Sequence, residues 1–77
     1  MSEKKVVTYR MIMHQNIERL QAISRRLSKL NTDLTEENSF VTEREVQELG
    51  KEAEQLLKWN ESMMKEINEF HKPAMVL

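Results

Sequence analysis

The 77-residue sequence contains no cysteine, one glycine, one proline and few aromatic residues. Without cysteine, the chain forms neither a disulfide framework nor a thiolate metal site. The scarcity of glycine and proline argues against turn-rich β structure and favours long helices. The shortage of aromatic side chains argues against a stacking platform for single-stranded nucleic acid.

Long apolar runs are also missing, so no segment of the sequence is suited to cross a bilayer as a helix. The first residues, Met1 to Val7, include two lysines but no apolar segment of signal-peptide length. We therefore expect no membrane insertion and no secretion, and a cytoplasmic or nuclear location.

The charges are divided unequally between the two halves of the chain. Residues 1–34 carry seven Lys/Arg against three Asp/Glu, whereas residues 35–77 carry five against ten. Opposite charges on the two halves favour their mutual attraction and leave little basic surface for a polyanion. We expect no nucleic-acid partner.

Two series of residues recur at alternating spacings of three and four, which is the heptad pattern of helices that pack as coiled coils. The first series is Val6, Tyr9, Met13, Asn16, Leu20, Ile23, Leu27, Leu30 and Leu34. The second is Val46, Leu49, Ala53, Leu56, Asn60, Met63, Ile67 and Phe70. With Val6 and Val46 at heptad position a, the pattern predicts one helix over about 6–34 and another over about 43–71.

The stretch between the two series predicts a loop over about 35–42. Thr42 and Glu45 have the spacing of a capping box that would begin the second helix. Pro73 stops that helix, and we expect residues 72–77 to form an irregular tail. The opposing possibility is one continuous helix that pairs with another chain, because no proline interrupts 35–41.

If the chain folds back at this loop, residues whose numbers add to 76 face each other. Every such layer joins position a to position d, and Asn16 then meets Asn60. A single polar layer fixes the register, since any shift would leave both amides in apolar surroundings. The sequence therefore predicts a single all-α domain over 1–77, an antiparallel two-helix hairpin that resembles a coiled coil.

The two edges of this seam differ. On one edge, Arg26 is expected near Glu52, and Arg19 near the face of Trp59. The other edge carries Ile17, Ser24, Gly50, Leu57 and Met64. Large apolar and small residues together predict a protein interface there, so we expect the hairpin to pair into a four-helix bundle. The partner is a second copy, giving a homodimer, or a different helical protein.

No residue pattern predicts a catalytic, cofactor or metal site. His14 and His71, the only histidines, are too far apart in this register to share a metal ion. The function that we expect is a non-enzymatic interaction module, a small assembly, adaptor or regulatory subunit that acts through helix packing and oligomer formation.

The stretch from Leu49 to Leu57 resembles a motif of the small helical-hairpin aspartyl phosphatases of sporulation phosphorelays. The agreement covers Leu49, Glu52, Leu56 and Leu57, whereas Gly50 replaces the family's serine and Glu54 its aspartate. The resemblance implies an alternative function, dephosphorylation of a phosphorylated response regulator.

Overall fold

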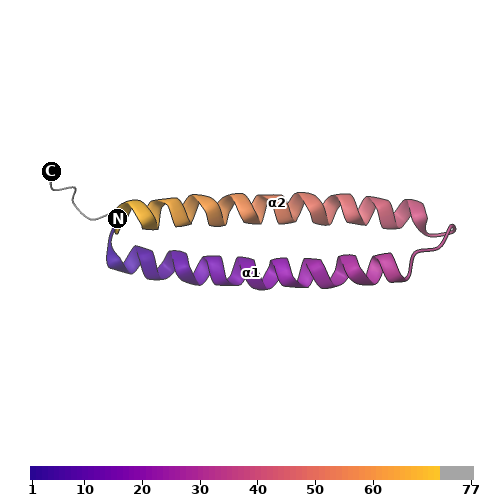
Figure 1. Ribbon diagram of the computed structural model, residues 1–77, viewed down its shortest axis with the longest axis horizontal. Helices are drawn as coiled ribbons and strands as arrows, with labels where there is room; N and C mark the ends of the chain where they lie inside the picture. The colour runs from indigo at the N-terminus through magenta and orange to yellow at the C-terminus, as the bar shows by residue number, and fades with distance from the viewer. Residues whose placement is uncertain (72–77) are drawn as a thin grey trace.

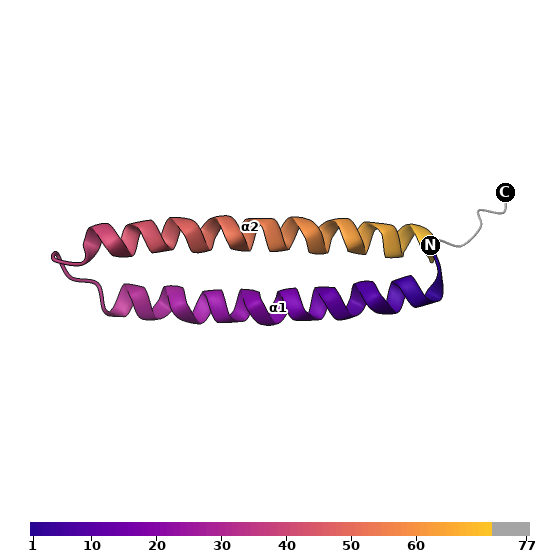
Figure 2. The same cartoon turned by 180° about the vertical axis from the view of Figure 1, so that it is seen from behind.

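The computed structural model describes residues 1–71 and shows two long helices that run antiparallel, side by side (Figures 1 and 2). Helix α1 spans Glu3–Thr32 and helix α2 spans Ser39–Phe70. The start of α1 and the end of α2 lie together at one end of the hairpin, which we call the terminal end, and the loop lies at the other. No strand occurs in residues 1–71, and the predicted all-α hairpin is confirmed.

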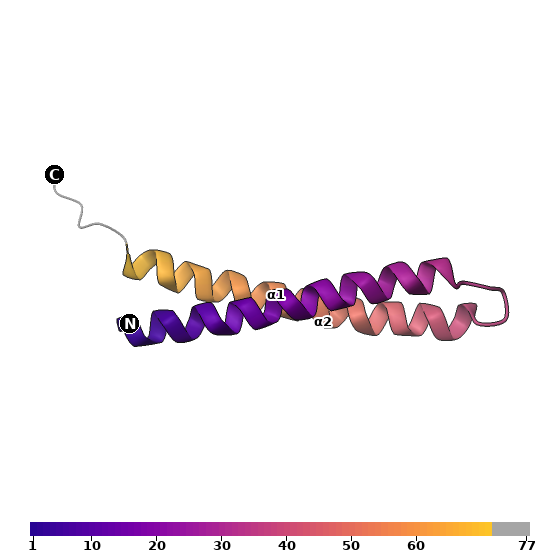
Figure 3. The same ribbon diagram turned by 90° about the horizontal axis from the view of Figure 1, so that it is seen from below.

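The buried residues lie along the predicted seam. Val6 and Ile23 of α1, with Leu56 and Ile67 of α2, are the buried apolar residues of the described chain, and each belongs to one of the two heptad series. Seen from below, the helices cross near their middles, as expected of helices that wrap around a common seam (Figure 3). The core is therefore a single thin layer between two helices.

Helix α1 begins and ends earlier than the heptad pattern predicts. Its start is at Glu3 rather than Val6, because the Ser2 hydroxyl accepts a hydrogen bond from the Lys5 N–H and caps the helix. Its end is at Thr32 rather than Leu34, and the N–H of Asp33 donates to the last turn. Leu34 therefore lies in the loop and is exposed.

Helix α2 also begins earlier than predicted, at Ser39 rather than 43, so the predicted cap at Thr42 is wrong. A reciprocal pair of side-chain-to-backbone hydrogen bonds lies upstream, in the turn before the helix. The Thr35 N–H donates to Asn38 Oδ1 at 2.9 Å, and the Asn38 N–H donates to Thr35 Oγ1 at 3.3 Å. The Thr42 N–H instead donates to the Asn38 carbonyl, and the Glu45 carboxylate accepts a hydrogen bond from Arg26.

Asn38 is the centre of the short loop, because its amide also donates to the Asp33 carbonyl at 3.1 Å. The side chain of one residue thus joins the end of α1 to the start of α2. At the opposite end, α2 stops at Phe70, one residue before the predicted limit. The predicted tail, 72–77, lies outside the described residues.

Candidate interaction surface

The two asparagines of the seam lie face to face. The Asn16 amide donates to Asn60 Oδ1 at 2.8 Å, and the Asn60 amide lies 3.4 Å from the Met13 carbonyl oxygen. Both asparagines are partly buried. Because this bond joins residues far apart in the sequence, it establishes that residues whose numbers add to 76 lie at the same height along the hairpin.

One edge of the seam is joined by ion pairs between the helices, and we call it the ion-pair flank. Arg19 binds Glu52, and Arg26 binds Glu45, each through two guanidinium nitrogens and both carboxylate oxygens. In the Arg26 pair, the two distances are 2.8 and 3.1 Å. All four residues occupy heptad position g.

These partners correct the predicted ones. Each g-position side chain lies between two g positions of the opposite helix, one heptad apart. Arg19 has Trp59 on one side and Glu52 on the other, and it binds the carboxylate, because a bidentate charged bond is stronger than a cation–π contact. With Glu52 taken, Arg26 binds Glu45.

The ion pairs change the proton affinity of their members. Hydrogen bonding to Arg26 holds the pKa of Glu45 below its usual value, and Arg19 does the same to the pKa of Glu52. The pKa values of the two arginines are raised in turn, again chiefly by hydrogen bonding to the carboxylates. Both pairs are solvent-accessible, so their contribution to stability is small and sensitive to salt.

The opposite edge, which we call the open flank, consists of the predicted interface residues Ile17, Ser24, Gly50, Leu57 and Met64. Its three large apolar side chains remain exposed, by 46% for Ile17, 57% for Leu57 and 46% for Met64. They occupy heptad position e, beside the seam but outside it.

The small residues of the open flank are exposed too. A Cβ atom added at Gly50 would meet nothing within 4 Å, so packing inside the hairpin does not require glycine there. Among residues 1–71, the inter-helix contact of a carboxylate with a basic side chain on this side is Glu3 with His71 at the terminal end, 3.9 Å apart, beyond the open flank itself.

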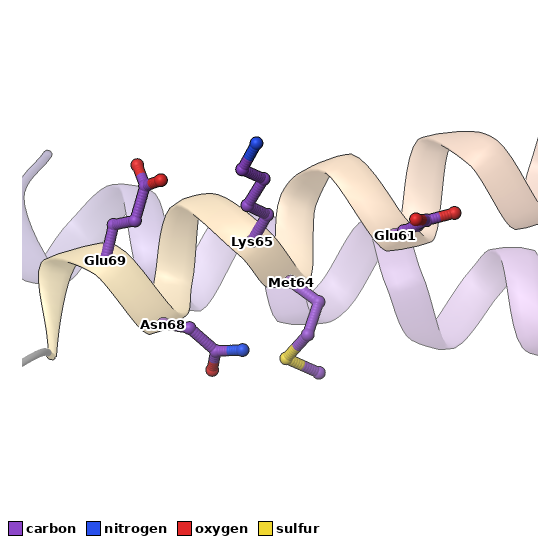
Figure 4. Close-up of a pocket in the computed structure, with 5 residues that line it drawn as sticks. All are labelled: Glu61, Met64, Lys65, Asn68 and Glu69. Atoms are coloured by element: carbon purple, nitrogen blue, oxygen red, sulfur yellow. The ribbon is translucent and has the colours of Figure 1, made fainter.

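Figure 4 shows how Met64 lies at the terminal half of α2. Met64 and Asn68 point to one side of the helix, whereas Lys65 and Glu69 point to the other. The shallow hollow at this place is lined by residues of α2 alone, so α1 supplies no wall to it. The Met64 side chain therefore projects over an open surface rather than into a pocket.

Sequence reasoning missed an exposed apolar group beside the loop. Phe40 and Val41, assigned there to the loop, form the first turn of α2 and are exposed by 77% and 68%. Their positions, b and c, point away from the seam. The available signal was that neither residue belongs to a heptad series although both are large and apolar.

The histidines do not gather with other metal ligands. His14 lies 3.0 Å from Glu18 on the outer surface of α1, and His71 lies at the terminal end. Within residues 1–71 no group of three or more His, Asp or Glu side chains is arranged to hold a metal ion. No helix in the same range is long and apolar enough to span a membrane.

The residues that resemble the phosphatase motif have clear roles within the hairpin. Leu49 and Leu56 belong to the seam, and Glu52 binds Arg19. Glu54, at the position of the family's aspartate, lies 3.4 Å from Lys58 on the exposed surface. Three of the four matching residues, Leu49, Glu52 and Leu56, therefore take part in contacts between the two helices, whereas Leu57 is exposed.

Comparison with known proteins adds no relative: no family model matches the chain, and no curated protein or solved structure matches it significantly. The functional argument therefore depends on the geometry of the hairpin.

Proposed function

We propose that this chain is a non-enzymatic protein–protein interaction module, a small helical assembly, adaptor or regulatory subunit whose contact surface is the open flank. The observation that carries this proposal is the exposure of Ile17, Leu57 and Met64 in a row beside the seam. Packing against another helix would remove these apolar side chains from water and complete a four-helix bundle.

The thin core supports the same proposal. Only one layer of side chains lies between α1 and α2, and a domain of this size gains little stability from so small a core. Gly50 adds to the argument, since glycine inside a helix costs about 1 kcal/mol relative to alanine. No contact within the hairpin offsets that cost. A neighbouring helix that approaches closely at Gly50 would offset it.

The direct test is a double substitution on the open flank, Ile17→Lys with Leu57→Lys. We expect sedimentation equilibrium to show the wild-type chain as an oligomer and the double variant as a monomer, because assembly would bury unpaired charge. Circular dichroism should show that the variant keeps its helices, since neither residue belongs to the seam.

A matched control places the same charges elsewhere. Gln15 and Gln55 are exposed at heptad position c, away from the open flank. Gln15→Lys with Gln55→Lys should leave the oligomer intact. A wild-type chain that is a well-folded monomer at tens of micromolar would contradict self-association and direct the search to a different helical protein.

The alternative function is a phosphatase that acts on a phosphorylated response regulator. It predicts that adding the protein to a phosphorylated receiver domain accelerates phosphate release, and that Glu54→Gln removes the effect. The interaction module predicts that the rate of release does not change.

A further inference from the structure

We propose that the occupant of the open flank is a second copy of this chain, related to the first by a two-fold axis parallel to the helices, so that both loops lie at the same end. This inference rests on the proposed function and adds to it the partner and its orientation. In this arrangement α1 of each copy packs on α2 of the other, and all neighbouring helices are antiparallel.

The heights of the apolar residues fit this arrangement. The bond between Asn16 and Asn60 places Ile17 level with residue 59 of α2. With the axis parallel to the helices, heights are the same in both copies. Ile17 of one copy therefore falls between Leu57 and Met64 of the other, and symmetry repeats the contact.

The small residues fit at the next level. Ser24 is level with residue 52, two positions from Gly50. In the proposed dimer, Ser24 of one copy thus faces the open surface above Gly50 of the other. Small side chains on both sides let the helices approach closely. Large residues therefore meet large ones, and small residues meet small ones.

The charges select this arrangement over the other two-fold choice. Positions e and b of α2, which line the open flank and its outer border, carry Glu43, Glu54 and Glu61 and no Lys or Arg. The same positions of α1 carry Arg10 and one carboxylate, Glu3, which lies near His71. Packing α1 on α2 of the second copy keeps these acidic rows apart.

The competing axis runs across the hairpin and packs α2 on α2. Setting Leu57 of one copy against Met64 of the other would then bring Glu61 within one residue of its own symmetry mate. In the proposed arrangement Glu61 is instead level with residue 15 of the second copy, next to His14, and Glu54 is level with residue 22, close to Arg25. Like-charge contacts disfavour the competing dimer.

The size of the face is sufficient. Two adjacent helices, each about 45 Å long and about 10 Å across, present roughly 900 Å². Specific interfaces bury about 800 Å² per partner. A dimer that uses the whole length of the hairpin therefore reaches the size of a stable complex.

The deciding experiment measures the distance between the two loops of a dimer. The chain has no cysteine, so Glu37→Cys introduces one attachment point for a spin label in the loop. Loops at the same end should be separated by roughly 10–25 Å, since packed helix axes lie 8–10 Å apart. Loops at opposite ends would be separated by at least about 45 Å, the length of a helix.

A label at Gln55→Cys, close to mid-length, is the control, because it gives a short distance in either dimer and reports that the dimer has formed. Long loop distances together with short Gln55 distances would overturn the proposed orientation while leaving the interaction module intact. Monomers in sedimentation equilibrium would overturn the second copy as the occupant.

Removing charges from the border of the open flank tests the orientation independently, because the two dimers predict opposite changes in affinity. Glu54→Gln with Glu61→Gln should weaken the proposed dimer by roughly two- to fivefold, because the exposed contacts of these carboxylates with Arg25 and His14 of the second copy are lost. In the competing dimer the same double variant would tighten association by relieving repulsion. A tighter double variant therefore contradicts the proposal.

Discussion

The two edges of the seam are built from the same heptad repeat, yet one makes contacts within the hairpin and the other leaves apolar surface exposed. The ion-pair flank joins α1 to α2 through Arg19–Glu52 and Arg26–Glu45, so these four charges are paired within the chain. The open flank has large apolar side chains and an uncovered glycine at the corresponding places. One edge completes the hairpin, and the other leaves it with surface to bury against a partner.

The largest expected effect comes from comparing two neighbours in the sequence, Leu56 in the seam and Leu57 on the open flank. Leu56 is 7% exposed and Leu57 is 57% exposed. Leu56→Ala should lower the free energy of unfolding by about 2–5 kcal/mol, because it leaves a cavity in the core between α1 and α2. Leu57→Ala should weaken assembly with a much smaller effect on the isolated hairpin.

Urea unfolding separates the two effects when it is measured in an Ile17→Lys background, at concentrations where sedimentation shows a monomer. Sedimentation of the alanine variants without Ile17→Lys measures assembly. Equal losses of unfolding free energy for the two alanine variants would show that the seam and the open flank do not differ in the isolated hairpin.

A second test removes the layer that keeps the two flanks aligned. Replacing Asn16 and Asn60 together by Leu should raise the free energy of unfolding by about 1 kcal/mol, because two partly buried amides become apolar. For a domain of this size, the gain corresponds to a Tm higher by roughly 4–8 °C. Register should become less uniform, which spin-label distances across the seam would show as a broadened distribution.

One result for the Asn16 and Asn60 double variant would contradict the role of these residues in fixing the register. A single narrow distance distribution, equal to that of the wild type, would mean that the ion-pair flank is sufficient to hold the register without the asparagines.

The third test concerns Gly50 of the open flank, where packing inside the hairpin does not require a glycine. Gly50→Ala should stabilise the isolated hairpin by about 1 kcal/mol, since alanine is the better helix former and its Cβ meets nothing. In the assembly, the added methyl group should hinder close approach and raise the Kd. Ser62→Ala, on the outer surface of the same helix, is the control that should leave the Kd unchanged. An unaltered Kd for Gly50→Ala would mean that no helix approaches there.

The smallest expected effect lies on the ion-pair flank itself. Because the pKa values of Glu45 and Glu52 are lowered in the fold, their stabilisation is fully present above the ordinary carboxyl pKa of 4.5. It is lost as the pH falls through the lowered values. Glu45→Gln with Glu52→Gln should lower Tm slightly at neutral pH and reduce the loss of Tm on acidification.

The charge-matched control for that variant is Glu36→Gln with Glu37→Gln, which removes two loop carboxylates that have no ion-pair partner among the described residues. Thermal unfolding between pH 3 and 7, at low and high salt, makes the comparison. If both double variants respond to acid alike, the ion-pair flank adds nothing specific.

The seam was predictable because heptad spacing places a residue on one face of a helix wherever the helix is formed. Asn16 and Asn60 illustrate this, since counting along the sequence was enough to place them in the same layer. The start of α2 was harder to predict from the sequence. Thr42 and Glu45 had the usual spacing for a cap, but Asn38 is the N-cap residue, and its side chain bonds to Thr35 in the turn before the helix. Several residues near a loop can cap a helix, and only the path of the backbone selects among them.

Spacing and composition by themselves therefore determined the two helices, the residues that line each edge and the register that follows if the chain folds back, because these properties follow from the helical period. The fold-back itself was decided by the structure, since the sequence of 35–41 also permits one continuous helix. Tertiary structure decided which charges meet. Arg19 lay within reach of both Trp59 and Glu52, and Arg26 within reach of Glu52 and Glu45, so the choice depended on how both helices share one edge. Long side chains reach either of two neighbours one heptad apart, and counting residues does not distinguish between them.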